Sequence, residues 1–427
     1  MTLVVPFEEI FSDEKSLLAR KVNWKRVELG KCASILNGYP FKSSLFSNDK
    51  GMPLIRIRDL NTHKPETYYP EKYPTEYVIR RGDLLIGMDG NFRCVEWQGS
   101  DGLLNQRVCK IIPNENLLNK RFLLHGINGY LDAIQAATSS VTVGHLSSLD
   151  ILRIPFPLPS MDEQHQITTK LDHITVRLDD AKARLETIPS ILKRFRISVL
   201  AAACSGRLTE DWRTSKNSDE LPVGWKFVKV GDLIPKGGIF DGPFGSNLKT
   251  SDYVEEGVRV IRLENIGHLH FNGDKRTYIS RKKYEMLKRH TVKAGDLIFA
   301  SFIMDEVRAC VLPDLTDVSI AKADCFCLRP TLNLVLPTFL AYELVCQDSH
   351  HALQEEVHGA TRPRVNIKQL KAHTVRWCPI EEQAEIIRRV ESLFRQADTI
   401  EARYRKAHAF TDKLMPSVLA KAFRGDL

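Results

Sequence analysis

The sequence predicts an α+β fold, with two globular domains built on curved, mostly antiparallel sheets and two long helices that pair antiparallel. Three observations support this prediction. The chain contains a long internal repeat, the most similar parts of the repeat carry a heptad pattern, and the remaining parts are rich in short strand-like runs. We therefore expect the two copies to be related by a pseudo-two-fold axis.

The repeat is clearest in two stretches of eleven residues. Residues 198–208 read SVLAAACSGRL and residues 417–427 read SVLAKAFRGDL, with seven identical positions. The same offset of 219 residues relates Asp162-Glu163-Gln164 to Glu381-Glu382-Gln383. Self-similarity at a long fixed period is typical of a duplicated structural unit. Because no insertion interrupts this stretch, it indicates a rigid element rather than a loop.

Upstream of this constant segment the match continues, but its offset changes. Trp24-Lys25 corresponds to Trp225-Lys226 at an offset of 201, and Gly82-Asp83-Leu84 corresponds to Gly295-Asp296-Leu297 at an offset of 213. Changing offsets indicate loops of different length within a shared fold. The chain therefore consists of two copies of one unit, each a variable globular part followed by a constant segment.

The constant segment has the spacing of a long helix. Its apolar or small residues recur in alternating steps of four and three, as in a heptad seam. In the first copy they are Ile167, Leu171, Ile174, Leu178, Ala181, Leu185, Ile188, Leu192, Phe195, Val199 and Ala202. A helix of about 43 residues spans roughly 65 Å. Such a stripe is also compatible with core packing inside one domain, but the length and the duplication favour two paired helices.

Local signals place the ends of both helices. Each begins after prolines with acidic residues in its first turn, and each ends at a glycine, Gly206 or Gly425. We expect Pro189 and Pro416 to kink or break the helices, at different points in the two copies. The second globular part follows the end of the first helix and leads into the start of the second. If the helices pair, they are antiparallel, with the globular parts at opposite ends.

The variable parts read as strand-rich domains with few helices. Runs such as PLIRIRDL, DLLIGMDG, VRVIRLENI and DLIFASF are separated by Gly, Pro, Asn and Asp. Single helical stretches are expected over residues 119–136 and 337–356. The predicted boundaries are residues 1–158 for the first domain, 159–213 for the first helix, 214–377 for the second domain and 378–427 for the second helix.

Composition limits the class of protein. With 43% hydrophobic and 27% charged residues, the chain is typical of globular proteins, and it has no apolar run of membrane-spanning length and no signal peptide pattern. The nine cysteines are scattered without a CxxC pair, which favours reduced thiols and a cytoplasmic location. The net charge of +8 is compatible with a polyanionic partner without requiring one.

Signals for enzymatic chemistry are weak. The sequence has no P-loop, no dinucleotide fingerprint and no Asp/Asn-Pro-Pro-aromatic motif of a methyltransferase that acts on amino groups. His350, His351 and His358 could suggest a metal, but they occupy a polar, helix-like stretch, and we predict no metal and no cofactor. Glu163 and Glu382 could pass for an acid/base pair, and we interpret them instead as first-turn helix residues.

The constant segments carry a family resemblance. Pro157-Leu158-Pro159, Asp162-Glu163-Gln164, the run from Phe195 to Thr209 and Asp211-Trp212-Arg213 together resemble the specificity subunit of a type I restriction–modification system. GPFGSNLK (residues 242–249), followed by VIRLENI and KAGDLI, is similar to the target-recognition domains of that family. The resemblance covers essentially the whole chain in the correct two-copy order.

This resemblance implies a non-catalytic subunit that recognises DNA. Each variable part would be a target-recognition domain that binds one half of a bipartite, asymmetric double-stranded target. The helix pair would set the gap between the halves and dock two methyltransferase subunits, with motor-nuclease (restriction) subunits joining in the full complex. Two different domains related by a pseudo-dyad also suit two different half-sites on the two strands of a duplex.

Candidate DNA contacts are basic and amide residues in loop-like positions beside Gly or Pro. Arginine pairs with guanine and Asn or Gln with adenine, whereas lysine mainly contacts phosphates. Any one of them could equally be a solvated surface residue, and Asp89-Gly90-Asn91 could be a tight turn. The candidates in the first domain are Lys42, Arg56, Arg58, Asn91, Arg93, Gln106 and Arg107. Those in the second are Asn247, Lys249, Arg262, Asn265, Arg308, Arg362 and Arg364.

Two alternatives remain open at the level of sequence. The chain could be an enzyme with an unrecognised active site, which methyl transfer by the isolated chain would reveal. It could also be a duplicated coiled-coil scaffold that binds proteins without DNA specificity. Specific DNA binding that survives raised salt would exclude the scaffold, because nonspecific phosphate contacts weaken steeply with salt.

Overall fold

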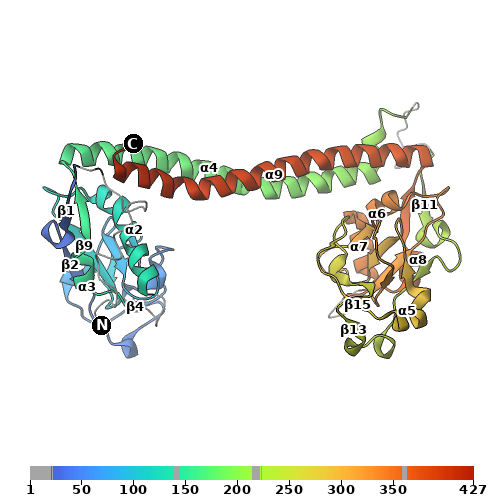
Figure 1. Ribbon diagram of the computed structural model, residues 1–427, viewed down its shortest axis with the longest axis horizontal. Helices are drawn as coiled ribbons and strands as arrows, with labels where there is room; N and C mark the ends of the chain where they lie inside the picture. Colours follow the sequence, from blue (N-terminus) through green and yellow to red (C-terminus); the bar gives the residue numbers. More distant parts are fainter. Residues whose placement is uncertain (1–20, 22, 139–144, 214–221, 223, 358–362) are drawn as a thin grey trace. The chain divides into compact units, whose positions relative to one another are not determined.

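The computed structural model describes residue 21 and residues 23–138, 145–213, 222, 224–357 and 363–427. The chain divides into two compact units, which Figure 1 shows in the colours of the sequence. Unit 1 comprises Met1–Glu186 and Arg405–Leu427, and unit 2 comprises Thr187–Tyr404. Each of the two long helices therefore contributes residues to both units.

The described strands of unit 1 form three sheets. The first pairs β1 (Lys25–Glu28) with β10 (Pro155–Leu158). The second has the order β2 (Ala33–Asn37), β9 (Val108–Pro113), β6 (Leu84–Gly87) and β7 (Cys94–Glu96). The third has the order β4 (Tyr68–Tyr69), β3 (Met52–Ile55), β8 (Gly102–Leu104) and β5 (Val78–Ile79). Neighbouring strands are antiparallel except for β3 and β8, which are parallel.

The core of unit 1 lies between its sheets, α2 (Lys120–Thr138) and the ends of both long helices; α3 (Ser148–Leu152) packs beside β2. Strand β6 is buried at every position, which explains its unbroken apolar sequence LLIG. Phe122 of α2 makes edge-on ring contacts with Trp24 and Phe156. The ring of Phe423, near the end of the chain, lies 4.9 Å from that of Phe122, so the last helical turn is part of this core.

Unit 2 has a corresponding set of sheets among its described residues. β11 (Lys226–Lys229) pairs with β21 (Thr374–Trp377). A second sheet has the order β12 (Ile239–Phe240), β20 (Cys325–Leu328), β17 (Leu297–Ala300) and β18 (Ala309–Val311). A third has the order β13 (Tyr253–Val254), β15 (Tyr278–Ile279), β14 (Val258–Ile261), β19 (Ser319–Ala321) and β16 (Thr291–Val292). Here β14 and β19 form the parallel pair.

The strand order of unit 2 follows that of unit 1, with β13 added at one edge. Each unit has a two-stranded sheet, a four-stranded antiparallel sheet and a sheet with one parallel pair. The corresponding strands of the two units follow one another in the same order along the chain. The helices of unit 2 are α5 (Arg281–Leu287), α6 (Pro337–Val345), α7 (Gln347–Glu356) and α8 (Ile367–Ala372). The expected mixed fold with mostly antiparallel sheets is therefore confirmed.

One expected helix is divided in two. Residues 337–356 were predicted as a single stretch, but α6 ends at Val345 and α7 begins at Gln347, because Cys346 has an extended conformation (φ −64°, ψ 157°). The carbonyl of Glu343 accepts hydrogen bonds from the Cys346 thiol at 3.1 Å and from the Ser349 hydroxyl at 2.5 Å. These side chains satisfy a carbonyl that the end of α6 would otherwise leave unpaired, and they stabilise the break.

The buried carboxyl of Glu343 leads to a pH prediction. Burial, with the nearby Cys346, raises the pKa of the Glu343 carboxyl well above its usual value, whereas a glutamate in an unfolded chain titrates near pH 4.3. Above that pH the folded protein keeps a proton that the unfolded chain loses, so this group disfavours folding increasingly as the pH rises. We expect Glu343→Gln to be more stable relative to the wild type at pH 8 than at pH 5, by at least about 1 kcal/mol, the equivalent of one pKa unit.

Urea unfolding of both proteins at several pH values measures this difference. A stability difference that stays constant between pH 5 and pH 8 would show that Glu343 is ionised in the folded protein.

The constant segments form α4 (Met161–Cys204) and α9 (Ile380–Arg424), of 44 and 45 residues. Glu163 and Glu382 lie in their first turns, as expected. Pro189 and Pro416 lie inside these helices and end neither, so of the two expected effects, a kink or a break, the break does not occur. A proline removes a single main-chain hydrogen bond, and the remaining bonds of so long a helix keep it continuous.

Glycines end both helices in the left-handed conformation. Gly206 has φ 72° and follows the last residues of α4, and Gly425 has φ 80° and directly follows α9. Glycine adopts this conformation without the steric cost that a Cβ atom imposes. The two glycines therefore act as the predicted helix stops.

Within each unit the two helices run side by side in opposite directions. In unit 1, Lys170 Nζ donates to the carbonyl of Leu427 at 3.0 Å, and Lys182 pairs with Asp412 at 3.4 Å. In unit 2, Arg196 pairs with Asp398 at 2.7 Å and with Glu401 at 2.9 Å. In unit 1 the partner's residue number falls as the number on α4 rises, which defines an antiparallel arrangement.

A buried glutamine joins each set of sheets to a helix start. Gln164 accepts from the backbone N–H of Asn119 at 2.7 Å and donates to the carbonyls of Leu117 and Pro159. It is fully buried, so these three bonds satisfy an amide that would otherwise be costly to enclose.

Gln383 makes the same set of contacts in unit 2. It accepts from the N–H of Leu336 at 2.8 Å and donates to the carbonyls of Leu334 and Cys378. It too is fully buried. The Glu-Gln pair of the repeat is thus explained by structure, with the glutamine fixing the turn that enters α2 in unit 1 or α6 in unit 2.

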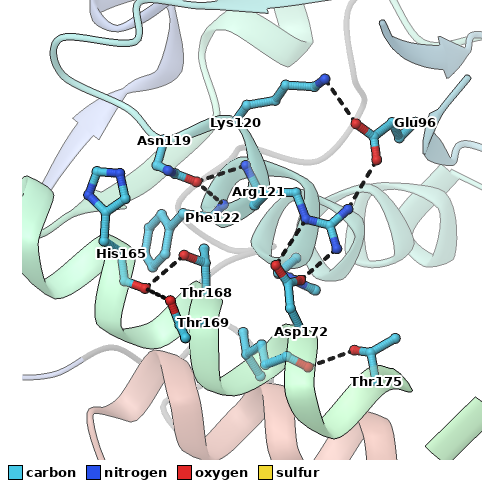
Figure 2. A network of polar contacts seen from close by, with 12 residues as sticks. Glu96, Asn119, Lys120, Arg121, Phe122, His165, Thr168, Thr169, Asp172 and Thr175 are labelled. Atoms are coloured by element: carbon cyan, nitrogen blue, oxygen red, sulfur yellow. Dashed lines mark hydrogen bonds and ion pairs between the residues drawn. The ribbon is translucent and has the colours of Figure 1, made fainter. Parts of the chain in front are cut away.

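A second joint is specific to unit 1 (Figure 2). Arg121 of α2 binds Asp172 of α4 through two nitrogens, at 2.5 and 3.3 Å, and Glu96 of β7 at 3.0 Å. His125 also contacts Asp172, at 2.9 Å. Partial burial raises the pKa of Asp172, but the hydrogen bonds from Arg121 and His125 outweigh burial and hold it below its usual value. This ionised carboxylate ties the first turns of α2 to α4.

Candidate nucleic-acid interface

Most candidates of the first domain lie on the surface of unit 1. Arg56 is half-buried, and the others are exposed, namely Lys42, Arg58, Asn91, Arg93, Gln106 and Arg107. The guanidinium of Arg58 donates to the Thr67 hydroxyl at 2.9 Å and lies 3.7 Å from Glu66. Arg58 is therefore partly engaged within its own domain.

Arg107 lies in a cluster of charged side chains. Its Nε is 3.2 Å from Asp89, and the other oxygen of Asp89 lies 2.5 Å from Nδ1 of His145. The candidate Asn91 follows Asp89 after Gly90, whose φ is 72°. Asp89 thus links one sequence-predicted candidate, Arg107, to His145, which the sequence pattern did not select.

In unit 2 the candidate Arg364 has the best-defined surroundings. Its guanidinium pairs with Asp324 at 2.5 Å and lies 5.4 Å from the ring centre of Phe244 and 5.9 Å from that of Phe302. Its side chain remains 42% exposed. Two aromatic faces and a carboxylate therefore fix the orientation of an arginine that still faces solvent.

Phe244 belongs to the GPFGSNLK loop, which is held tightly to the sheet. A Cβ atom at Gly242 would lie 2.1 Å from the backbone carbon of Lys322, so only glycine allows this approach. Asp241 accepts from the N–H groups of Gly242 and Asp324, at 2.7 and 2.9 Å. Burial, with the nearby charge of Asp324, raises the pKa of Asp241 to about 6. The loop candidates Asn247 and Lys249 are exposed.

A second basic pair surrounds one aromatic ring of unit 2. The candidate Arg262 and the unselected Lys322 lie 5.7 and 5.5 Å from the ring centre of Tyr253. The carboxylate of Glu264 is 3.9 Å from Arg262, at the limit of an ion pair. Two cations held next to one ring suit a partner with closely spaced negative charges.

Two candidates of the second domain are structural. Asn265 is only 2% exposed, and its amide donates to the carbonyls of Asn272 and Lys275 and accepts from the N–H of Arg262. Arg308 donates to the carbonyl of Leu263 at 3.0 Å. The amide of Asn265 and the Nη1 of Arg308 therefore serve neighbouring loops, and their choice as DNA contacts stays a prediction.

Two residues lie outside the described residues: the candidate DNA contact Arg362, and His358, one of the three histidines that could suggest a metal. The Nε2–H of His350 donates to the carbonyl of Ile303 at 3.1 Å. Within the residues that the structure describes, no group of three His, Cys, Asp or Glu side chains is placed to hold a metal ion. Each cysteine is buried and free of a disulfide.

Sequence reasoning missed the side chains that orient the exposed arginines. Asp89, Asp324, Phe244 and Phe302 are neither basic nor amide residues, and a search for base-reading side chains passed over them. Phe244, an aromatic residue in an otherwise small and polar loop, was the available sequence signal, and in the structure its side chain is 47% exposed.

The candidates of the second domain are separate from a cavity in unit 2. That cavity has a volume of about 520 Å³ and is lined by residues of α4, α6, α7 and α9, including Leu192, Ile197 and Val345. None of the candidate DNA contacts lines it. Among the described helices, none has the length and hydropathy needed to cross a bilayer.

Comparison with known proteins gives the class of protein. Residues 21–189 match the model of the type I restriction modification DNA specificity domain. The chain is 38% identical over 434 aligned residues to the type I restriction enzyme EcoBI specificity subunit of Escherichia coli, an alignment covering 97% of this chain and 90% of that protein. It is 27% identical to the EcoKI specificity subunit of Escherichia coli strain K12, over 95% of this chain and 89% of that protein.

Solved structures share the fold. A chain from a study of complex assembly and conformational transition in a type I restriction–modification system aligns with a TM-score of 0.69 at 19% identity, covering 96% of this chain and 99% of that one. The HsdS subunit of Thermoanaerobacter tengcongensis aligns with a TM-score of 0.59 at 18% identity, covering 96% and 98%. On the sequence similarity above, this chain belongs to the family of type I restriction–modification specificity subunits.

Proposed function

We propose that this chain is the non-catalytic subunit that gives a type I restriction–modification complex its DNA sequence specificity. Family membership, together with the exposed, oriented arginines, is the observation that carries this conclusion. Residues 1–158 and 214–377 would be the two target-recognition domains, each binding one half of a bipartite target. The matching strand orders in the two units support a duplicated recognition domain.

The long helices would set the distance between the half-sites. Residues 159–213 and 378–427 would form the spacer, supported by the continuous helices α4 and α9 and by their antiparallel contacts within each unit. The constant surfaces of this spacer would dock two methyltransferase subunits, and restriction subunits would join them. The complex would bind its DNA target in the cytoplasm.

Methylation mapping tests this proposal. DNA from cells that produce the chain with its modification subunit is sequenced by a single-molecule method, with cells lacking the chain as control. We expect methylated adenines at one bipartite motif made of two short, different half-site sequences (words). In the control this motif should carry no methylated adenine. Absence of any such motif, with a soluble assembled complex, would favour the protein-binding scaffold instead.

The spacer role makes a quantitative prediction. Seven residues inserted after Glu186 in α4 and after Tyr404 in α9 preserve the heptad face and add about 10 Å. Since duplex DNA rises about 3.4 Å per base pair, we expect the gap to lengthen by about 3 base pairs with both words unchanged. In the control, seven residues are inserted in α4 alone. The two helices then differ in length and lose their pairing register, so methylation should be abolished. Altered words with an unchanged gap would refute the spacer role.

A further inference from the structure

Three backbone positions of unit 1 meet at one place next to strand β6. The N–H of Met88 donates to the carbonyl of Arg107 at 3.0 Å, and the N–H of Leu146 donates to the carbonyl of Met88 at 2.8 Å. Asp89, the residue after Met88, forms a β-bridge with His145. These bonds place the side chains of Asp89, Arg107 and His145 together, where they form the ion pairs described above.

Unit 2 repeats the same backbone connections next to β17. The N–H of Ser301 donates to the carbonyl of Asp324, and the N–H of Val365 donates to the carbonyl of Ser301, both at 2.9 Å. Phe302, the residue after Ser301, forms a β-bridge with Arg364. The set Phe302, Asp324 and Arg364 therefore occupies the three positions that Asp89, Arg107 and His145 occupy in unit 1. We call each set of three side chains a triad.

The two triads use a similar chemistry in different arrangements. Each holds one exposed arginine against one aspartate, but the aspartate comes from the first position in unit 1 (Asp89) and from the second in unit 2 (Asp324). The arginine comes from the second position in unit 1 and from the third in unit 2. The three backbone positions therefore correspond in the two units, but the arginine stands at a different one of them in each unit.

An arginine that is held in this way is preorganised to recognise a base. The aspartate and, in unit 2, the two phenyl rings hold the side chain, so little conformational freedom remains to be lost on binding. The guanidinium has five N–H donors in a planar fork, and the side chains of Arg107 and Arg364 remain 54% and 42% exposed. A partly exposed fork matches the O6 and N7 acceptors of guanine in the major groove.

We propose that these triads are specificity-determining sites, at which Arg107 reads a guanine in one half-site and Arg364 reads a guanine in the other. Asp89 and Asp324 act as positioning residues that orient these arginines. The proposal rests on the proposed function, since it assigns the residues through which each recognition domain distinguishes bases.

The test uses the complex of the chain with its methyltransferase subunits. Binding is measured to duplexes carrying the mapped wild-type target and to a panel with each base pair of both words substituted in turn. For Arg364→Gln we expect the discrimination at one G·C pair of one word to fall by about 10- to 100-fold, with the other word read as before. Arg107→Gln should have the same effect on the other word.

Further variants separate reading from charge and from folding. Arg364→Lys keeps the charge but removes the fork, and it should lose the same discrimination while binding to unrelated DNA stays within about twofold of the wild type. Asp324→Asn should weaken discrimination at the same base pair as Arg364→Gln. The matched control is Arg281→Gln, an exposed arginine of α5 outside the triad, which should leave every base preference unchanged.

Two results would overturn the proposal. If Arg364→Gln weakened binding to all duplexes equally, Arg364 would be a phosphate contact. If Arg364→Gln and Arg107→Gln altered the same word, the triads would not read separate half-sites. Failure of the wild-type complex to prefer the mapped target is a different outcome, because it would refute the proposed function itself.

Discussion

Replacement of Glu382 by alanine is expected to lower the local free energy of unfolding of unit 2 by about 3–5 kcal/mol. The carboxylate of Glu382 is 3% exposed. It pairs with Arg213 at 2.5 Å, and accepts from the Thr209 hydroxyl at 2.7 Å and from the indole N–H of Trp225 at 3.0 Å. Its removal leaves a largely buried guanidinium without its counter-charge, which is costly in a medium of low polarity.

The repeat supplies a matched control in unit 1. Glu163 occupies the position that corresponds to Glu382 and contacts Lys21 at 3.3 Å and the indole of Trp24 at 3.4 Å, but its side chain is 36% exposed. An exposed ion pair contributes less than about 1 kcal/mol, so Glu163→Ala should have a much smaller effect. Hydrogen exchange resolved by peptide measures each unit separately. Similar losses in the two variants would contradict the role of burial.

Replacement of Phe423 by alanine is expected to destabilise unit 1 by about 3–5 kcal/mol, because it creates a cavity in a core that packs at high density. Phe423 is 4% exposed and packs against the rings of Phe122 and Phe156. A Cβ atom at Gly126 would lie only 2.5 Å from the Phe423 ring. The Phe423 ring therefore occupies the space that a side chain at position 126 would need, which explains the glycine in the middle of α2.

A double-mutant cycle checks this explanation. Gly126→Ala should destabilise the wild type, although alanine normally favours a helix over glycine by about 1 kcal/mol. In the Phe423→Ala background the same change should cost less, since the new methyl group enters the vacated space. Additive effects of the two substitutions, measured by thermal unfolding, would show that the two positions do not compete for one space.

The long helices were the most predictable part of the fold. Their heptad spacing, acidic first turns and terminal glycines are local signals, and each corresponds to an observed feature of α4 and α9. The break at Cys346 was not predictable in this way. It depends on hydrogen bonds of Cys346 and Ser349 to one carbonyl, and no periodic pattern encodes such an arrangement.

The surroundings of the candidate DNA contacts could not be predicted from the sequence, for a physical reason. An arginine or asparagine in a loop has the same local sequence signal whether it faces solvent or serves the backbone. Asn265 and Arg364 were both selected from loop-like positions, but Asn265 bonds to three backbone groups while Arg364 lies against two rings and a carboxylate. Only the three-dimensional pairing of distant segments separates these two cases.

The buried glutamines have a consequence for how such a protein can diversify. Within the described part of the chain, every hydrogen bond of the Gln164 and Gln383 side chains goes to a main-chain atom. Because every amino acid except proline offers the same main-chain N–H and C=O groups, the side chains of the residues that supply these groups can change without removing the bonds. A globular part of different sequence can thus inherit a working connection to the helices.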